Sequence, residues 1–216
     1  MNSRRPSLLD ERLPQRLAKR LTRPLPGPAV GTRFEPRPLV GRHYDRSPPG
    51  ARPAAVLLLL YPHEGRWHLP LTLRPATLAD HAGQVSLPGG AIEEGESPYE
   101  AACREFHEEL GVREAVFERL GRLSPVYIAS SGFRVEPFLA YCRVRPPMRP
   151  EPSEVAELIE VPLEQLLDPA HFGAHERNRQ GHCYTAPHFA FRRHRVWGAT
   201  CMLLGELVLL LEDLAA

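Results

Sequence analysis

The sequence of 216 residues has only four cysteines, and none of them stands in a Cys-x-x-Cys pair. The scattered positions Cys103, Cys142, Cys183 and Cys201 therefore indicate neither a structural zinc site nor a disulfide framework. Free thiols of this kind fit a reducing compartment. We therefore expect a cytoplasmic protein.

Long apolar runs are also absent. No stretch approaches the roughly 20 apolar residues that a transmembrane helix needs, and the start MNSRRPSLLDERL lacks the apolar core of a signal peptide. The formal net charge is only +1, so no overall field favours nucleic acid or a membrane surface. We expect neither as a partner.

The charge that is present is unevenly distributed. The first 50 residues hold eleven Lys or Arg against four acids, which gives them +7 and leaves −6 for the remainder. They are also rich in proline, and the one helical stretch, residues 8–21, is interrupted by Pro14. We interpret residues 1–52 as an arm that partly wraps the rest of the chain or stays disordered, and residues 53–216 as one domain. A basic arm could also bind anionic surfaces or serve as an organelle address, but Asp10 and Glu11 weaken both ideas.

From Ala54 onward the sequence predicts strands. The run AAVLLLLY at residues 54–61 is typical of a strand that is buried on both faces. Residues 63–66 form a turn, and residues 67–74 are the expected hairpin partner, with Pro70 favouring an edge or a bulge.

Further strands are expected along the chain, interleaved with helices. The apolar patterns predict strands at residues 85–87, 115–123, 133–144, 154–163 and 184–196, a helical turn at 163–167 and a helix at 197–214. Strands interleaved with helices indicate an α/β fold with a mixed sheet between helical layers.

The acidic stretch from Gly90 to Val112 carries the strongest signals. Ser97 and Glu100 form a capping box, and Gly111 suits a helix C-cap, so a helix is predicted from Pro98 to Leu110. Within it Glu105, Glu108 and Glu109 share one face.

This cluster of glutamates has two interpretations. Crowded carboxylates can hold a hard divalent cation such as Mg²⁺ or Mn²⁺, which takes oxygen ligands. Alternatively they form a solvated helix face, with Arg104 and Glu108 as an ordinary i, i+4 pair. On charge alone the solvated face is favoured.

The wider pattern reverses that preference. Gly90, Glu96 and the segment REFHEELGV at residues 104–112 match every fixed position of the Nudix box, so the chain resembles the Nudix hydrolases. The resemblance implies a Nudix-type α/β/α sandwich and hydrolysis of a nucleoside diphosphate linked to another group. It implies Glu105, Glu108 and Glu109 as metal ligands for Mg²⁺ or Mn²⁺ and Arg104 as the residue that orients them. Glu105 and Glu154 are both candidates for the catalytic base, while Glu96 has a structural or a metal-binding role.

The segment before the box resembles the extra motif of the coenzyme A pyrophosphatase subfamily. Six positions agree with that motif: Thr72, Arg74, Gly83, Pro88, Gly89 and Gly90. Three depart from it: Pro75, Ala79 and Leu87. Downstream, residues 124–138, 152–163 and 197–200 are also similar to that subfamily. The resemblance implies cleavage of coenzyme A to phosphopantetheine and adenosine bisphosphate, with Arg74, Gly83, Gly89 and Gly90 binding the substrate.

Two other functions stay open. The first is a Nudix pyrophosphatase for ADP-ribose, oxidised nucleoside triphosphates or dinucleoside polyphosphates. The second is a Nudix domain without catalysis that senses a ligand, although such domains usually lose glutamates of the box. The expected partner is a small nucleotide, and a homodimer is not decided by the sequence.

Overall fold

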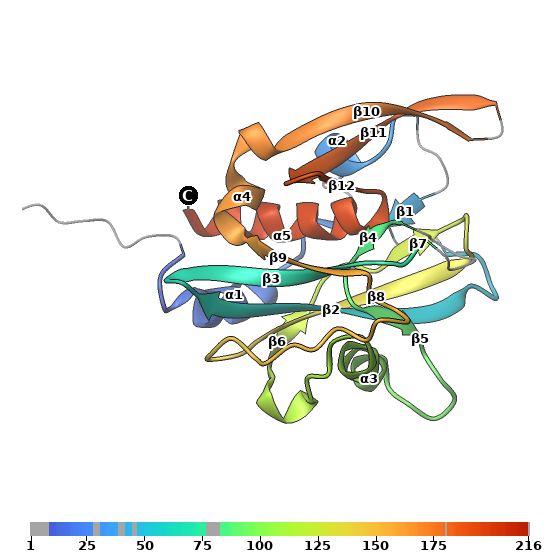
Figure 1. Cartoon of the computed structure of the whole chain (residues 1–216). Coiled ribbons are helices and arrows are strands. Elements are labelled where there is room, and N and C mark those ends of the chain that lie inside the picture. Colours follow the sequence, from blue (N-terminus) through green and yellow to red (C-terminus); the bar gives the residue numbers. More distant parts are fainter. Residues whose placement is uncertain are drawn as a thin grey trace, which may run out of the picture.

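The computed structural model describes residues 9–27, 31–38, 42–44, 47–76, 83–179 and 181–215 (Figure 1). The helices are α1 (Leu13–Leu21), α2 (Gly31–Phe34), α3 (Pro98–Leu110), α4 (Leu163–Leu167) and α5 (Ala199–Ala215), with short 3₁₀ helices η2 (Glu114–Val116) and η3 (Pro169–His171). The strands are β1 (Arg42–Tyr44), β2 (Arg52–His63), β3 (Arg66–Leu73), β4 (Val85–Ser86), β5 (Gly89–Ala91), β6 (Glu118–Arg122), β7 (Val126–Ile128), β8 (Phe133–Tyr141), β9 (Glu157–Pro162), β10 (Phe172–Arg179), β11 (His182–Phe191) and β12 (His194–Trp197).

Nine of the strands in the described part of the chain form one sheet. Its main order is β1-β7-β8-β2-β3-β4, with β5 on β2, β6 on β8 and β9 on β3. The central strands β2 and β8 run parallel, with Arg52 opposite Phe133 and Leu60 opposite Tyr141. Their neighbours pair antiparallel. The sheet is therefore mixed, as the sequence predicts.

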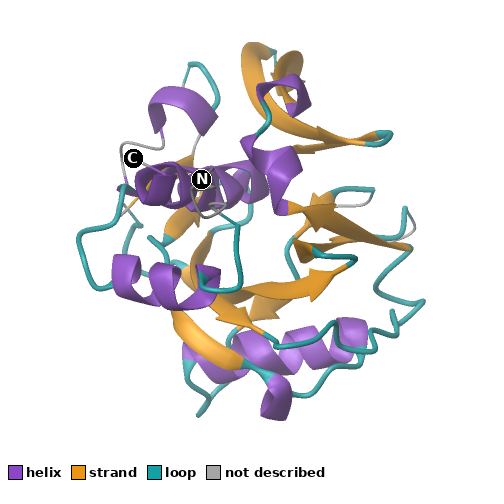
Figure 2. Cartoon of the chain, turned by 90° about the vertical axis from the view of Figure 1, so that its left-hand side faces the viewer, coloured by secondary structure: helices purple, strands orange, loops and turns teal. Residues whose placement is uncertain are grey.

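Helices cover both faces of this sheet. Helix α3 lies below it and α5 above it, and the view turned by 90° shows the same layers (Figures 1 and 2). The expected α/β/α sandwich is confirmed. A three-stranded sheet of β10, β11 and β12 lies above α5 and adds a layer that the sequence did not predict.

Strand β2 contributes to the core on both sides, because successive side chains of a strand point to opposite faces. Leu57, Leu59 and Tyr61 pack toward α3 with Phe106 and Leu110, and all five are fully buried. The apolar run in β2 is therefore buried on both faces, as predicted.

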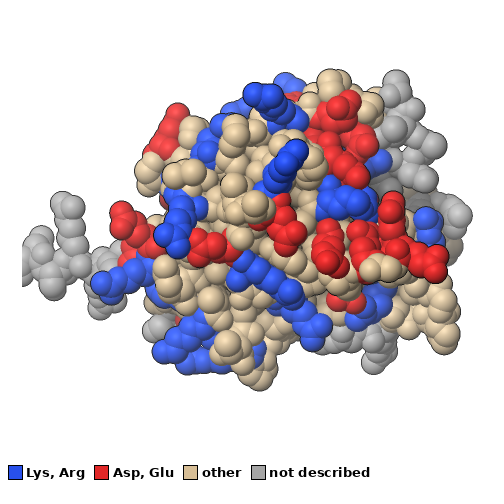
Figure 3. All heavy atoms as spheres, turned by 90° about the horizontal axis from the view of Figure 1, so that it is seen from below, with Lys and Arg blue, Asp and Glu red and all other residues tan. Residues whose placement is uncertain are grey.

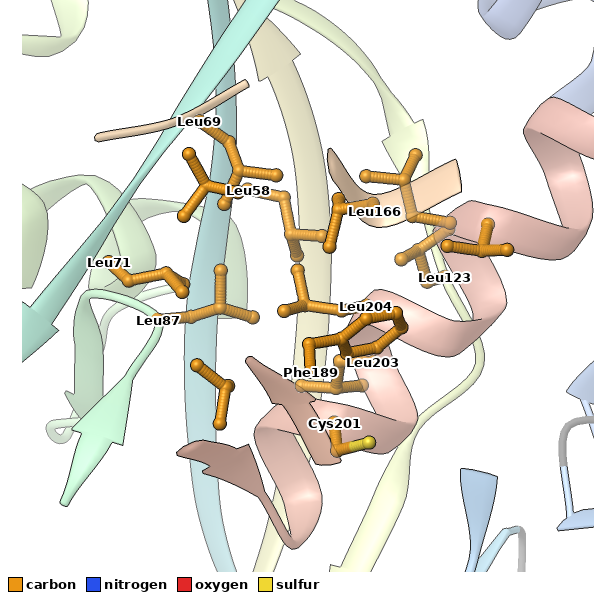
Figure 4. Close-up of a cluster of buried hydrophobic side chains, with 14 of the residues drawn as sticks. Leu58, Leu69, Leu71, Leu87, Leu123, Leu166, Phe189, Cys201, Leu203 and Leu204 are labelled. Atoms are coloured by element: carbon orange, nitrogen blue, oxygen red, sulfur yellow. The ribbon is translucent and has the colours of Figure 1, made fainter. Parts of the chain in front are cut away.

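The alternate residues of β2 belong to the second core, toward α5. Leu58 and Leu60 lie in a cluster with Leu203, Leu204 and Leu207. Figure 4 shows Leu58, with other leucines of the sheet, facing side chains of α5 and Phe189 of β11. Burial of each of these leucines stabilises the fold by on the order of 2 kcal/mol, so β2 contributes to the stability of both cores.

Part of the N-terminal arm packs on the domain. Leu13 and Leu17 of α1 are fully buried in the core beside α5. Pro14 stands in the first turn of α1, where a missing N–H removes no helical hydrogen bond, so the proline begins the helix. Strand β1 extends the main sheet by pairing with β7. The domain boundary after residue 52 stays a prediction.

A buried carboxylate on α5 holds the middle of this arm, at Gly27. Glu206 is fully buried and accepts hydrogen bonds from the backbone N–H of Gly27 (3.0 Å) and of Ser124 (2.8 Å). The Ser124 hydroxyl donates a further bond of 2.7 Å. Glu206 therefore joins the arm, α5 and the loop before β7.

Several sequence-based bounds differ from the structure. The C-terminal helix begins at Ala199 rather than Trp197, because Trp197 ends β12 opposite His188. The expected strand at 115–123 begins as the helix η2, and the one at 154–163 begins at Glu157. The strand at 133–144 ends at Tyr141.

Two strands of the hairpin regions also depart from expectation. Strand β3 is not at the edge, since β9 pairs along it, but its pairing with β2 stops at His68, two residues before Pro70. Pro70, which has no backbone N–H, therefore stands where β3 no longer pairs with β2. Strand β10 was missed because its sequence FGAHERNR has no apolar alternation. Within the described residues, no helix is long and apolar enough to cross a membrane.

Candidate active site

Helix α3 has the predicted bounds because both of its ends are capped. The Ser97 hydroxyl accepts a hydrogen bond from the Glu100 backbone N–H (3.3 Å), and the Glu100 carboxylate accepts one from the Ser97 N–H (2.7 Å). Gly111 ends the helix in the left-handed conformation, with φ of 71°. The capping box and C-cap are thus confirmed, and they fix the direction of the glutamates.

Arg104 connects three glutamates of the acidic stretch. It binds Glu96 through two bonds, from Nε (3.1 Å) and Nη2 (2.9 Å). Its Nη1 donates to Glu105 (3.0 Å) and to Glu108 (3.0 Å), and Nη2 also donates to the carbonyl of Ala91 (3.0 Å). Arg104 therefore lies where a residue that orients the glutamates must lie. Glu96 serves here as its bidentate partner.

Glu105 lies directly against Gly90 of β5, the first residue of the box. A β-carbon placed on Gly90 would come within 2.4 Å of a carboxylate oxygen of Glu105, so any side chain here would displace that carboxylate. Burial raises the pKa of Glu105 above its ordinary value, although the Arg104 guanidinium opposes the shift. Gly90 thus gives the Glu105 carboxylate its place.

Glu109 is the most buried of the predicted ligands, with 3% of its surface exposed. Its oxygens accept hydrogen bonds from the Thr72 hydroxyl (3.0 Å) and from the Gly89 backbone N–H (3.2 Å). Burial raises the pKa of Glu109 to about 7, and the charge of Glu105 adds to the rise while Arg74 opposes it. Thr72 and Gly89 therefore hold a carboxylate that lacks a full countercharge.

The loop between β8 and β9 brings a fourth carboxylate close to this group. The Glu151 N–H donates to the Glu109 carbonyl (2.9 Å), and the Glu154 N–H donates to the Glu151 carbonyl (3.0 Å). The negative charge of Glu154 helps to raise the pKa of Glu105. Seen from the side of α3, acidic side chains gather on the right-hand half of the face (Figure 3). The structure thus brings Glu154 near Glu105.

The four carboxylates are oxygen donors that differ in burial and in their partners. In the residues that the structure describes, no three His, Cys, Asp or Glu side chains form a metal-binding group as they stand. Two carboxylates nevertheless have raised pKa values through burial and mutual repulsion, and Glu108 keeps 47% of its side chain exposed. Such oxygen donors fit a hard divalent cation, which would relieve that repulsion.

A pocket of about 350 Å³ lies beside the Gly89–Gly90 turn. Strands β2, β4, β5 and β8 form its walls together with the start of α5. Its lining includes the predicted residues Arg74, Gly89 and Gly90. It contains no Asp or Glu among the residues that the structure describes. Gly83, the fourth predicted residue, does not line the pocket. Its N–H donates to the Arg74 carbonyl (3.2 Å) in the hairpin.

Two polar atoms of the pocket residues are buried without a partner. These are Nε of Arg74 and the hydroxyl oxygen of Ser131, as far as the described residues go. Buried polar atoms are normally hydrogen-bonded. A ligand in the pocket would supply the partner that these two atoms lack. Ser131 and Phe133 both line the pocket, so residues 131–133 contribute to it as well as forming a turn.

Sequence reasoning did not identify every residue of the site. Thr72 was matched to a motif but given no role, although the same motif could have indicated a polar contact. Arg52 was assigned to the arm, yet it lines the pocket, because the parallel pairing of β2 and β8 places it opposite Phe133. Ala79, which departs from the motif, and His81, two positions before Gly83, lie outside the described residues.

The chain is similar to known proteins over most of its length. The NUDIX domain family model matches residues 51–180. A protein of Pectobacterium atrosepticum, named uncharacterized Nudix hydrolase NudL, is 32% identical over 189 residues, which cover 84% of this chain and 97% of the relative. A NudL protein of Photorhabdus laumondii is 32% identical over 157 residues and covers 72% and 83%.

Among solved structures, a Nudix hydrolase from M. smegmatis, RenU, is similar to 53% of this chain and 73% of its own length, with 28% identity and a TM-score of 0.46. The family model spans more than half of the chain, and the relatives above cover most of it. The family model and the two NudL relatives, together with a complete box on a capped helix, show that the chain belongs to the Nudix hydrolase family.

Proposed function

We propose that this Nudix hydrolase cleaves the diphosphate bond of coenzyme A, or of its thioesters, to phosphopantetheine and adenosine bisphosphate. The names of the relatives give no substrate, so the proposal depends on residues outside the box.

One observation carries the proposal. The segments that resemble the coenzyme A subfamily are far apart in the sequence, yet residues from each of three of them line a single pocket. They are Arg74, Leu87, Gly89 and Gly90 before the helix, Ser131 and Phe133 after it, and Trp197–Thr200 at the start of α5. Gly90 also contacts Glu105, so the pocket adjoins the carboxylates of the box. A motif that selects a substrate would be expected to meet at one such place.

The departures from the subfamily motif have different consequences. Leu87, where the motif has Phe, is 3% exposed and lines the pocket, so the apolar wall is kept with a smaller side chain. Arg74, which the motif shares, brings a positive charge close to Glu109. In that place its guanidinium would bind a diphosphate oxygen.

Glu105, Glu108 and Glu109 would hold the metal, Mg²⁺ or Mn²⁺. When bound, the cation would neutralise negative charge on the diphosphate, while one of its phosphorus atoms forms a bond to water and loses its bond to the leaving group. Arg104 keeps two of these carboxylates oriented, and Thr72 and Gly89 hold the third.

A carboxylate must also take the proton of the attacking water. Glu105 has a pKa raised by burial, which makes its carboxylate a stronger base than an exposed glutamate. Glu154 is the second candidate, because it lies near Glu105 on a loop tied to the end of α3. Replacing each with Gln separates them. The base is the residue whose loss removes the acidic limb of the pH profile of kcat.

The compartment and the assembly are parts of the same proposal. The four cysteines are free and three of them are buried, which suits a reducing cytoplasm. A homodimer is tested by sedimentation of the purified protein.

A panel of substrates with Mg²⁺ or Mn²⁺ tests the activity, with products identified by mass spectrometry. The expected result is that coenzyme A and its thioesters yield phosphopantetheine species and adenosine bisphosphate. Cleavage of ADP-ribose, oxidised nucleoside triphosphates or dinucleoside polyphosphates while coenzyme A stays intact would replace the proposal. No turnover of any of them would favour a ligand-sensing domain.

A further inference from the structure

Two arginines line the pocket, and they lie at different distances from the box. Arg74 acts on the box itself, since its charge lowers the pKa of Glu109. Arg52 begins β2, three residues before Ala55, which is the partner of Gly90. Three residues of extended strand span about 10 Å, so the backbone of Arg52 lies well away from Gly90 along β2.

The guanidinium of Arg52 is held in place without an acidic partner. Its central carbon lies 4.2 Å from the ring centroid of Phe133, and its backbone N–H donates to the Gly132 carbonyl (2.8 Å). Among the described residues no carboxylate forms an ion pair with it. Stacking on a ring fixes the plane of a guanidinium and leaves its N–H edge available, which is the arrangement that binds a phosphate.

Other groups around this end of the pocket also favour an anion. The buried hydroxyl of Ser131 has no partner in the described residues and lies two positions before Phe133. Gly198, Ala199 and Thr200 bring the positive end of the 17-residue helix α5 to the same pocket. Since no acidic residue of the described part of the chain lies in the lining, no carboxylate in that lining offsets these positive groups.

We propose that the Arg52 end of the pocket binds a second phosphate of the substrate, on the ribose ring and separate from the diphosphate that is cleaved. This inference rests on the proposed function, because coenzyme A carries a 3′-phosphate on its adenosine. Dinucleoside polyphosphates and ADP-ribose lack that group. The site would therefore select adenosine nucleotides that carry both a 5′-phosphate and a ribose phosphate.

Binding of two product-like nucleotides tests the inference without any turnover. Calorimetry compares adenosine 3′,5′-bisphosphate with adenosine 5′-monophosphate on the wild-type protein, on Arg52→Gln and on Arg134→Gln. Arg134 is the matched control, since it lies one residue from Phe133 on β8, pairs with Glu136 and does not line the pocket.

The expected result is a preference of the wild type for the bisphosphate by about 10- to 100-fold. Arg52→Gln should remove that preference and leave the affinity for the monophosphate within about twofold, whereas Arg134→Gln should keep it. An equal loss of affinity for both nucleotides in Arg52→Gln, or the same effect in Arg134→Gln, would overturn the inference.

Kinetics with coenzyme A and 3′-dephospho-coenzyme A distinguish this inference from the proposed function. If coenzyme A is not cleaved but the bisphosphate binds through Arg52, the proposed function fails and the phosphate site stands. If coenzyme A is cleaved and Arg52→Gln slows both substrates equally, the phosphate site fails and the proposed function stands.

Discussion

The carboxylate of Glu105 lies so close to Gly90 that a β-carbon on this glycine would stand 2.4 Å from one of its oxygens. A turn of the sheet and a side chain of the helix are thus fitted to each other. Because the two residues are 15 positions apart, the glycine is required by contact with the helix rather than by local backbone conformation.

Gly90→Ala should therefore reduce activity much more than stability. The added methyl group displaces Glu105, and a shift of about 1 Å in a catalytic group can lower kcat by about 100-fold. Steady-state kinetics on the substrate found by the panel measure the loss, and circular dichroism checks the fold. Gly173→Ala is the control, since its β-carbon would meet only His188, at 3.2 Å, away from the box. Equal kcat values in the two variants would contradict the contact.

Glu108→Gln and Glu109→Gln should each remove most of the metal-dependent turnover while the protein stays folded. Each change removes the negative charge of one proposed ligand but keeps the size of the side chain. Titration with Mg²⁺ or Mn²⁺, followed by kcat, checks this expectation. Glu94→Gln serves as the control, because Glu94 is exposed in the loop before α3. Unchanged turnover in both ligand variants would exclude the proposed metal site.

The metal-free protein should lose stability as the pH rises from 5 to 8. Burial raises the pKa of Glu109 from its ordinary 4.5 to about 7, so the folded state keeps a proton that the unfolded chain releases. Stability from this group is full below pH 4.5 and is lost as the pH rises through 7, by up to about 3 kcal/mol.

Urea denaturation in the presence of a chelator measures this effect. Glu109→Gln carries no charge at either pH, so its stability should fall less than that of the wild type. Glu105 and Glu109 repel each other, so the difference between the two curves reports Glu109 together with its coupling to Glu105. Parallel curves for the two proteins would show that Glu109 is not desolvated.

Glu206→Ala should destabilise the fold strongly. The change leaves the N–H groups of Gly27 and Ser124 and the Ser124 hydroxyl without their buried acceptor, at a cost of about 3 kcal/mol or more. Glu212→Ala on the same helix removes only a part-exposed ion pair with Arg33, which contributes below about 1 kcal/mol. Urea midpoints for the two variants give the comparison, and similar losses would argue against a buried anchor.

Local signals in the sequence predicted α3 to the residue, because the capping box, Pro98 and Gly111 all act within the helix itself. The strand β2 was also predicted, since its apolar run is continuous. What failed was decided by tertiary contacts. The polar segment of β10 becomes a strand only through its pairing with β11.

The site shows the same division. The carboxylates of α3 could be predicted because their spacing places them on one face. The position of Arg52 against Phe133 could not, since it depends on a parallel pairing between strands 81 residues apart in the chain. Similarly, the contact of Thr72 with Glu109 joins β3 to α3, and the two residues are 37 positions apart in the chain.

The alternation of side chains along β2 has a consequence for how such an enzyme can change. Ala54 and Val56 face the pocket, whereas Ala55 and Leu57 face α3. In the proposed function, substitutions at Ala54 and Val56 would reshape the wall against the substrate, while Ala55 and Leu57 keep α3 in place. Substrate choice and bond cleavage would then depend on opposite faces of one strand, so a new specificity could arise without changes to the residues that perform the reaction.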